Sequence, residues 1–228
     1  MDHKSANAFI KKLDKYQKVY YESLMSTPLT CCNARAGSGK TTIAVLAGLQ
    51  LLDVGAVNRL IYLRFPDKKT QGLGALPGEL EEKEAYYMGP FMEALTEFGI
   101  MQEEFDRLKG QEQIQVCTNT TWRGANVKDS FLIIDEAQNG DFDDLKMVLT
   151  RIHDESCKAA LIGHSAQCDN PRSRKVDVFS AYIHHMCQKS FAKETPLKIN
   201  HRGKLSDWAD RLMYDPIKGE FYVDRGKD

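Results

Sequence analysis

The stretch NARAGSGKTT, residues 33–42, decides the fold of this 228-residue chain. It follows the apolar run PLTCC, which has the length of a buried strand, and it leads into the apolar helical pattern TTIAVLAGLQLL, residues 41–52. Between Ala34 and Thr41 the turn matches the phosphate-binding pattern (A/G)xxxxGK(S/T), in the strand and helix context that this pattern requires. A strand, a glycine-rich turn and a helix in this order are typical of an α/β domain.

The residue types of the turn suit a triphosphate. Gly37 and Gly39 can take backbone angles that point successive N–H groups at an anion, next to the positive end of the helix dipole. Lys40 adds a charge between the β- and γ-phosphates, and Thr41 offers a hydroxyl to Mg²⁺. The predicted phosphate-binding residues are Ala36, Gly37, Ser38, Gly39, Lys40, Thr41 and Thr42.

Outward from this turn, short apolar runs alternate with helical patterns. The runs of strand length are residues 29–32, 59–65, 114–118, 130–137, 159–163 and 196–200. The expected helices are residues 6–24, 41–52, 79–98 and 142–152. Short continuous apolar strands between helices predict one α/β domain, with a mainly parallel sheet covered on both faces.

Composition narrows the class of protein. A hydrophobic content of 42% over 228 residues is enough for one substantial core. The formal net charge of −1 gives no global basic field, so a nucleic-acid partner needs a local basic patch. No apolar run approaches the ~20 residues that span a bilayer, and the six cysteines form no CxxC pair and follow no signal peptide. We therefore expect a cytoplasmic protein without a membrane partner.

A second acidic motif lies at the end of a predicted strand. In FLIIDEAQN, residues 131–139, four apolar residues precede Asp135 and Glu136. Ligands of parallel α/β sheets bind at the carboxyl ends of the strands, so both acids are expected to face the phosphate-binding turn. Asp135 suits the magnesium ion, and Glu136 suits orientation or deprotonation of an attacking water. The alternative is a solvated acid pair at a strand end.

Two further side chains fit hydrolysis of a phosphoanhydride. Gln167 follows the predicted strand that ends in LIGHSAQ, where it is placed to sense the γ-phosphate. Arg202 follows LKINHRG, where it is placed to neutralise charge in the transition state, and Arg151 is the alternative arginine. The predicted catalytic residues are therefore Lys40, Glu136, Gln167 and Arg202.

Together these motifs resemble the PhoH family of P-loop ATPases, whose fold is the RecA-like core of superfamily 1 helicases. The resemblance covers residues 10–203, and its most specific part is WRGANVKDSFLIIDEAQN, residues 122–139. KYQKVYYESL looks like the glutamine motif of the family, which implies that Gln17 reads the adenine edge. Where the family usually has Gly-Asp before the glutamine of its third motif, this chain has Gly163 and His164.

The resemblance implies Mg²⁺-dependent ATP hydrolysis coupled to RNA or single-stranded DNA. It implies a glutamine-motif helix in residues 1–28, a RecA-like core in residues 29–203, and a C-terminal helix and tail in residues 204–228. Because one domain cannot close on a nucleotide as a helicase pair does, we expect a homo-oligomer such as a hexameric ring. In that ring Arg202 or Arg151 completes a neighbour's site. The chain length implies a phage-type member of the family.

Two polar loops are candidates for nucleic-acid contact. One spans residues 66–78 and carries Lys68 and Lys69, and the other carries Arg172, Arg174 and Lys175. Binding of single strands combines positive charge with stacking aromatics, and Phe65 and Trp122 lie near such positions in the sequence. Solvated loop charge is the alternative for both loops. The tail after residue 214 has few apolar residues and is expected to fray.

Two other functions are alternatives to the ATPase hypothesis. A nucleotide-gated binding or assembly module with little hydrolysis is favoured by His164 in place of an acid. A small-molecule kinase shares the phosphate-binding turn, but the DEAQ stretch and the paired glutamine and arginine signals count against it, since kinases seldom need a water-orienting glutamate.

Overall fold

The computed structural model describes residues 1–66, 80–119, 121–122, 127–153, 155–168, 176–215 and 219–223 of the chain. Its helices are α1 (His3–Lys12), α2 (Lys15–Ser26), α3 (Lys40–Asp53), α5 (Leu80–Glu97), α6 (Gln102–Gly110), α7 (Phe142–Leu149), α9 (Val178–Met186) and α10 (Lys204–Asp210). Its strands are β1 (Leu29–Asn33), β2 (Arg59–Arg64), β3 (Ile114–Thr118), β4 (Ser130–Asp135), β5 (Lys158–Gly163), β6 (Ala192–Glu194), β7 (Leu212–Asp215) and β8 (Glu220–Val223).

A six-stranded parallel sheet forms the centre of the molecule, in the order β3-β2-β4-β5-β1-β6. The predicted fold class, a mainly parallel sheet flanked by helices, is therefore confirmed. The strand that precedes the glycine-rich turn, β1, is separated by β5 from β4, the strand that ends in Asp135. Because all strands run the same way, the segments that follow β1, β4 and β5 meet at one edge of the sheet.

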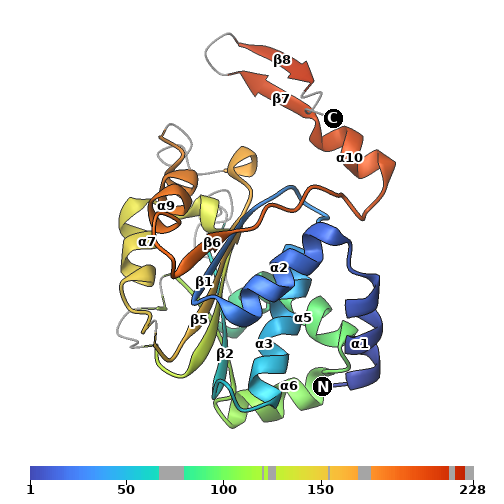
Figure 1. Ribbon diagram of the computed structural model, residues 1–228, viewed down its shortest axis with the longest axis vertical. Helices are drawn as coiled ribbons and strands as arrows, with labels where there is room; N and C mark the ends of the chain where they lie inside the picture. Colours follow the sequence, from blue (N-terminus) through green and yellow to red (C-terminus); the bar gives the residue numbers. More distant parts are fainter. Residues whose placement is uncertain are drawn as a thin grey trace.

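Helices cover both faces of the sheet, as the short continuous apolar strands predict (Figure 1). On one face, α1, α2, α3, α5 and α6 enclose a core cluster that includes Tyr20, Leu46 and Phe91. On the other face, α7 and α9 cover a second cluster that includes Leu145 and Phe179. No helix in the described part of the chain is long and apolar enough to cross a membrane.

The N-terminal region forms two helices instead of the single helix predicted for residues 6–24. The first helix ends before Leu13, which has extended backbone angles, and Asp14 begins α2 as its N-cap. The Asp14 side chain accepts hydrogen bonds from the N–H groups of Tyr16 and Gln17, and the Gln17 side chain accepts one from the Asp14 N–H. This capping box starts a new helix where the apolar spacing alone suggested continuity.

The strand predicted for residues 196–200 is not present, because the chain leaves the sheet earlier. Strand β6 spans Ala192–Glu194 beside β1, and the Thr195 N–H continues this contact with a hydrogen bond to the Cys31 carbonyl at 2.9 Å. The following residues cross to the glycine-rich turn. Near the C-terminal end, β7 and β8 pair as an antiparallel hairpin that projects from the body (Figure 1).

Candidate nucleotide-binding site

The glycine-rich turn has the backbone that its sequence predicts. Gly37 has a φ of +77° and Gly39 a φ of +86°, both in the left-handed region that glycine adopts at little cost. Gly39 is also the N-cap of α3, so the first free N–H groups of that helix open towards the turn. An anion at this point faces N–H donors and the positive end of the helix.

Lys40 is held within this turn by backbone oxygens. Its Nζ donates to the carbonyl of Ala34 at 2.6 Å and to that of Arg35 at 2.9 Å. Burial lowers the pKa of Lys40, while Cys32, Asp135 and Glu136 act in the opposite direction. The side chain is thus tied to the turn, and acidic residues lie near its charge.

Asp135 lies at the end of β4 with an exposure of 3% and two hydroxyl donors. Its Oδ2 accepts from Thr41 Oγ1 at 3.2 Å and from Tyr62 Oη at 2.6 Å. The structure therefore brings together Thr41 and Asp135, the two residues predicted for the metal. Hard oxygen donors beside a phosphate-binding turn fit Mg²⁺, which such sites hold through few protein ligands and the phosphates themselves.

Glu136 follows Asp135 with left-handed backbone angles, φ +53° and ψ +36°. Its Oε2 accepts from Gln138 Nε2 at 2.6 Å, and its Oε1 lies 3.8 Å from Arg64 Nη2. Burial and then the charge of Asp135 raise the pKa of Glu136, whereas Arg64 lowers it. A carboxylate with a raised pKa is a better proton acceptor than a solvated one.

These side chains share one cavity of about 370 Å³. Its lining includes the predicted residues Ala36, Gly37, Gly39, Lys40, Thr41, Thr42, Asp135, Glu136, Gln167 and Arg202. His164, which stands where the family usually has an acid, lines it as well. All four predicted catalytic residues thus lie around one space at the carboxyl edge of the sheet.

The two candidate arginines have different places. Arg202 lies against the glycine-rich turn of the same chain. A Cβ added to Gly37 would come within 2.8 Å of Arg202 Cγ. The preceding His201 donates its N–H to the Gly37 carbonyl at 2.8 Å. Arg151, in contrast, donates to the carbonyl of Trp122 at 2.9 Å and is absent from the cavity lining. Arg202 is therefore the arginine that this chain brings to its own site.

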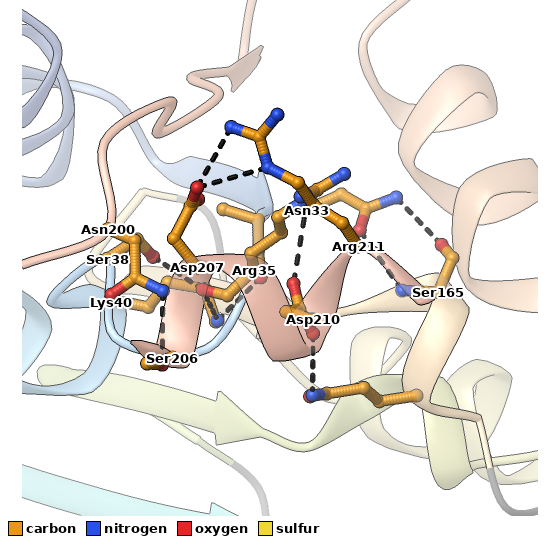
Figure 2. Close-up of polar contacts among 12 residues, drawn as sticks. Asn33, Arg35, Ser38, Lys40, Ser165, Asn200, Ser206, Asp207, Asp210 and Arg211 are labelled. Atoms are coloured by element: carbon orange, nitrogen blue, oxygen red, sulfur yellow. Dashed lines mark hydrogen bonds and ion pairs between the residues drawn. The ribbon is translucent and has the colours of Figure 1, made fainter. Parts of the chain in front are cut away.

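The C-terminal helix α10 lies across the glycine-rich turn (Figure 2). Asp210 at its end points towards Arg35, with Oδ2 3.6 Å from Arg35 Nε, and its Oδ1 accepts from Gln167 Nε2 at 3.4 Å. At the other end of the helix, Asn200 donates to Ser206 Oγ at 3.2 Å. Sequence reasoning identified neither Asp210 nor α10 as neighbours of the site, and no local motif marks them.

Gln17 borders a second cavity of about 530 Å³ next to the first. Its Nε2 donates to the Ser38 carbonyl at 3.0 Å, so the predicted adenine reader contacts the phosphate-binding turn. Phe9 and Leu13 contribute apolar surface to this cavity, and His201 borders both cavities. An apolar wall beside an amide suits a nucleobase.

Several sequence expectations about the surroundings of the site are wrong or lie outside the described residues. Phe65 and Trp122, proposed as stacking aromatics, are each 1% exposed and belong to the second core cluster. The basic side chains proposed for nucleic-acid contact lie outside the described residues: Lys68, Lys69, Arg172, Arg174 and Lys175. Sequence reasoning also missed Tyr62 and Arg64. The sheet reveals them, because β2 lies beside β4 and Arg64 is in register with Asp135.

Comparison with known proteins identifies the family. The PhoH-like protein family matches residues 9–199, which is most of the chain. The chain belongs to the PhoH family. Similar relatives are protein PhoH2 of Bacillus subtilis, 38% identical over 160 residues, and a PhoH-like protein of Synechocystis, 35% identical over 159 residues. These matches cover 68% and 70% of this chain but 36% and 48% of the relatives, so the chain spans less than half of their length.

Solved structures with a similar fold include helicase domains. The Pyrococcus furiosus Hef helicase domain covers 85% of this chain at 14% identity, with a TM-score of 0.49 and 40% of its own length matched. The Sulfolobus solfataricus SWI2/SNF2 ATPase core, solved in complex with double-stranded DNA, covers 81% at a TM-score of 0.44, with 44% of its own length matched. These likenesses concern the fold of one domain. The family and the glycine-rich turn that opens α3 make the PhoH chain a P-loop NTPase domain.

Proposed function

We propose that this PhoH protein binds ATP with Mg²⁺ and hydrolyses its β–γ phosphoanhydride bond. The observation that carries the proposal is the shared cavity, in which Lys40, Thr41, Asp135 and Glu136 lie around one space. A phosphate-binding turn alone suits many nucleotide proteins. A turn combined with a buried acid and a second carboxylate beside it suits transfer of a phosphoryl group to water.

Each side chain has a distinct part in this chemistry. Lys40 and the N–H groups of the turn bind the phosphates, and Thr41 with Asp135 holds the metal. Mg²⁺, when bound, neutralises charge on the β- and γ-phosphates. Glu136 orients the attacking water and accepts its proton, and the hydrogen bond from Gln138 supports that orientation.

Gln167 and Arg202 complete the γ-phosphate side of the proposal. Both side chains line the cavity, and Arg202 lies against the glycine-rich turn itself. Arg202 is supplied by the same chain, so we propose that it neutralises transition-state charge in cis. The proposed homo-oligomeric ring then serves to move or hold the nucleic-acid partner. Light scattering on the purified protein measures how many copies of the chain assemble.

The base of the nucleotide is proposed to occupy the second cavity. Gln17 faces it from α2 and Phe9 from α1, while His201 lies at the junction with the phosphate cavity. A purine ring pairs its polar edge with the Gln17 amide and its face with the apolar wall. This arrangement favours ATP over a bare phosphate ligand.

Coupling to a nucleic acid is the finer part of the proposal. It is supported by the basic loops at residues 66–78 and 171–175 and by the resemblance to helicase cores. Either RNA or single-stranded DNA fits such loops, since both present a phosphate backbone and free bases. We expect the partner to be cytoplasmic nucleic acid in a bacterial cell.

Steady-state hydrolysis of ATP tests the proposed function. The wild type is compared with Lys40→Ala and Glu136→Gln, with Lys193→Ala on the exposed edge strand β6 as the matched control, and each is titrated with single-stranded RNA and DNA. We expect both site variants to lose about a hundredfold or more in kcat, because each removes charge stabilisation or proton transfer. The control should keep wild-type rates, and stimulation by one nucleic acid names the partner.

A nucleotide switch with little hydrolysis is the second candidate. His164 favours it, because this half-buried imidazole lines the phosphate cavity where the family usually has a carboxylate. Burial lowers the pKa of His164, which keeps the ring neutral at physiological pH. If the wild type binds ATP but turns over no faster than Glu136→Gln, the switch replaces the ATPase as the function.

A further inference from the structure

Gln138 is a buried amide that connects two walls of the nucleotide cavity. It lies in the short 3-10 helix Ala137–Asn139 after β4, and its exposure is 1%. Its Nε2 donates to Glu136 Oε2 at 2.6 Å, and its Oε1 accepts from the His164 N–H at 3.0 Å. One side chain therefore contacts the acidic end of β4 and the segment that follows β5.

The backbone at Glu136 makes this contact possible. A left-handed φ of +53° is uncommon for a non-glycine residue and costs free energy that other interactions must offset. The Glu136 N–H donates to Asp135 Oδ1 at 2.9 Å, which stabilises the reversal at the end of the strand. The reversal lets the side chains of Glu136 and Gln138, two positions apart, meet on one side of the chain.

Gly163 leaves the space that Gln138 occupies. A Cβ added to Gly163 would overlap Gln138 Oε1 and would also come within 3.1 Å of Phe179 Cζ. Gly163 ends β5, and the next residues lead into the short helix Ser165–Gln167, which carries Gln167. Any side chain at position 163 pushes the amide away from His164, so glycine is required here by close approach.

Glu136 is held at both carboxylate oxygens. Gln138 donates to Oε2, and Arg64 faces Oε1 from the neighbouring strand β2 at 3.8 Å. The Gln138 contact is the shorter of the two, and a neutral amide can donate to the carboxylate and accept from a backbone N–H at the same time. Neither a carboxylate nor an apolar side chain of the same length can serve both partners.

We infer that Gln138 is a positioning residue that fixes Glu136 with its amide nitrogen and the start of the Ser165–Gln167 turn with its amide oxygen. The water-orienting carboxylate and the γ-phosphate sensor are then set relative to each other by one side chain. A shift of the sensor turn on nucleotide binding is passed to Glu136 through this amide. The inference rests on the proposed function for the catalytic meaning of Glu136, but the physical link between the two walls is independent of it.

The kinetic test separates positioning from nucleotide binding. Gln138→Met removes both hydrogen bonds at similar volume, and Gln138→Glu keeps the shape but loses the donor. We expect kcat for ATP hydrolysis to fall about tenfold or more in each variant, because proton transfer depends on geometry, while KM changes less than about threefold. Gly163→Ala, on the opposite wall of the cavity, should likewise lower kcat with little change in KM. Gly110→Ala is the matched control, because a Cβ added there would meet open space. Unchanged kcat in the Gln138 variants overturns the inference.

A second test needs no hydrolysis. The backbone amide resonance of His164 is recorded by NMR in the wild type and in Glu136→Ala, and again in the Gln138→Met background. If Gln138 links the walls, Glu136→Ala shifts the His164 resonance in the first background and leaves it in place in the second. Equal shifts in both backgrounds, or none in the first, overturn the link. If the wild type hydrolyses no ATP, the proposed function fails while this test still decides the role of Gln138; if Gln138→Met does not fold, Gln138→Glu serves as the background.

Discussion

The acidic side of the cavity, at the ends of β2, β4 and β5, and the C-terminal side, formed by residues 197–210, hold their functional groups in different ways. On the acidic side every residue of β4 is buried, and Asp135 accepts from Tyr62 at 2.6 Å. On the C-terminal side no residue of α10 is buried, and Asp210 contacts Arg35 and Gln167 at 3.6 Å and 3.4 Å. The hydrogen bond to Asp135 is thus short and lies in a buried strand, whereas the contacts of Asp210 are longer and belong to a helix without buried residues.

This difference predicts which side of the cavity adjusts when a nucleotide enters. Segments with few buried apolar contacts open locally at a lower free energy than core strands do. We therefore expect the acidic side to keep its arrangement when a nucleotide binds, and the exposed helix α10 to be the part that shifts. We expect the metal and water positions to be set before binding and the arginine side to be set by it.

The largest expected effect comes from matched truncations of an apolar side chain on the two sides. Ile133 in β4 is 0% exposed, and Leu205 in α10 is 85% exposed. Ile133→Ala should lower the free energy of unfolding by about 2–5 kcal/mol, because it leaves a cavity in the core, and Leu205→Ala should change it by less than about 0.5 kcal/mol. Denaturant unfolding monitored by circular dichroism measures both. Equal losses would show that α10 is packed as firmly as β4.

The next largest effect concerns Asp135, which accepts hydrogen bonds from the hydroxyls of Thr41 and Tyr62. Asp135→Asn should reduce ATP hydrolysis about a hundredfold or more, since it removes the negative charge proposed to hold Mg²⁺. EDTA should abolish wild-type hydrolysis, and added Mg²⁺ should restore it. Asp143→Asn, an exposed position on α7, is the control and should hydrolyse like the wild type. Wild-type rates in Asp135→Asn would remove this residue from the metal site.

The smallest effect tests the C-terminal side. Asp210 places a carboxylate near Lys40 and Arg35, where the phosphates of a nucleotide are expected. Asp210→Asn should tighten ATP binding about threefold by removing this like charge, with a change in unfolding free energy under about 0.5 kcal/mol. Asp207→Asn is the matched control, because Asp207 lies on the same helix and loses an ion pair to Arg211, the C-cap of that helix. Calorimetric titration with a non-hydrolysable ATP analogue measures both, and weaker binding by Asp210→Asn would mean that Asp210 supports the site.

The parts of the site that the sequence predicted are those encoded by neighbouring residues. The turn from Ala34 to Thr41 specifies its own backbone, because Gly37 and Gly39 supply the left-handed angles and the flanking apolar runs supply a strand and a helix. The acids after β4 follow from a continuous apolar run, which is typical of a parallel strand buried on both faces. The parallel sheet and the meeting of Lys40, Thr41, Asp135 and Glu136 therefore agree with prediction.

The parts that the sequence could not predict depend on which elements become neighbours. The contact between Gln138 and His164 requires knowing that β4 and β5 lie side by side, and the contact of Asn200 with Gly37 requires the path of the chain after β6. The prediction that Phe65 is a stacking aromatic was wrong because burial depends on tertiary packing. Its ring lies so close to Gly140 that a Cβ added there would come within 3.2 Å of it. The break between α1 and α2 did have a local signal, the capping box that begins at Asp14.

The two tryptophans of this chain lie in opposite environments, and this gives the molecule its own optical reporter. Trp122 is 1% exposed within the core, whereas Trp208 is 66% exposed on α10, the helix that crosses the phosphate-binding turn. A soluble collisional quencher such as acrylamide reaches the indole of Trp208 and leaves that of Trp122 protected. Fluorescence of the unlabelled protein therefore reports on the exposed helix α10 separately from the core, with the buried indole as an internal standard.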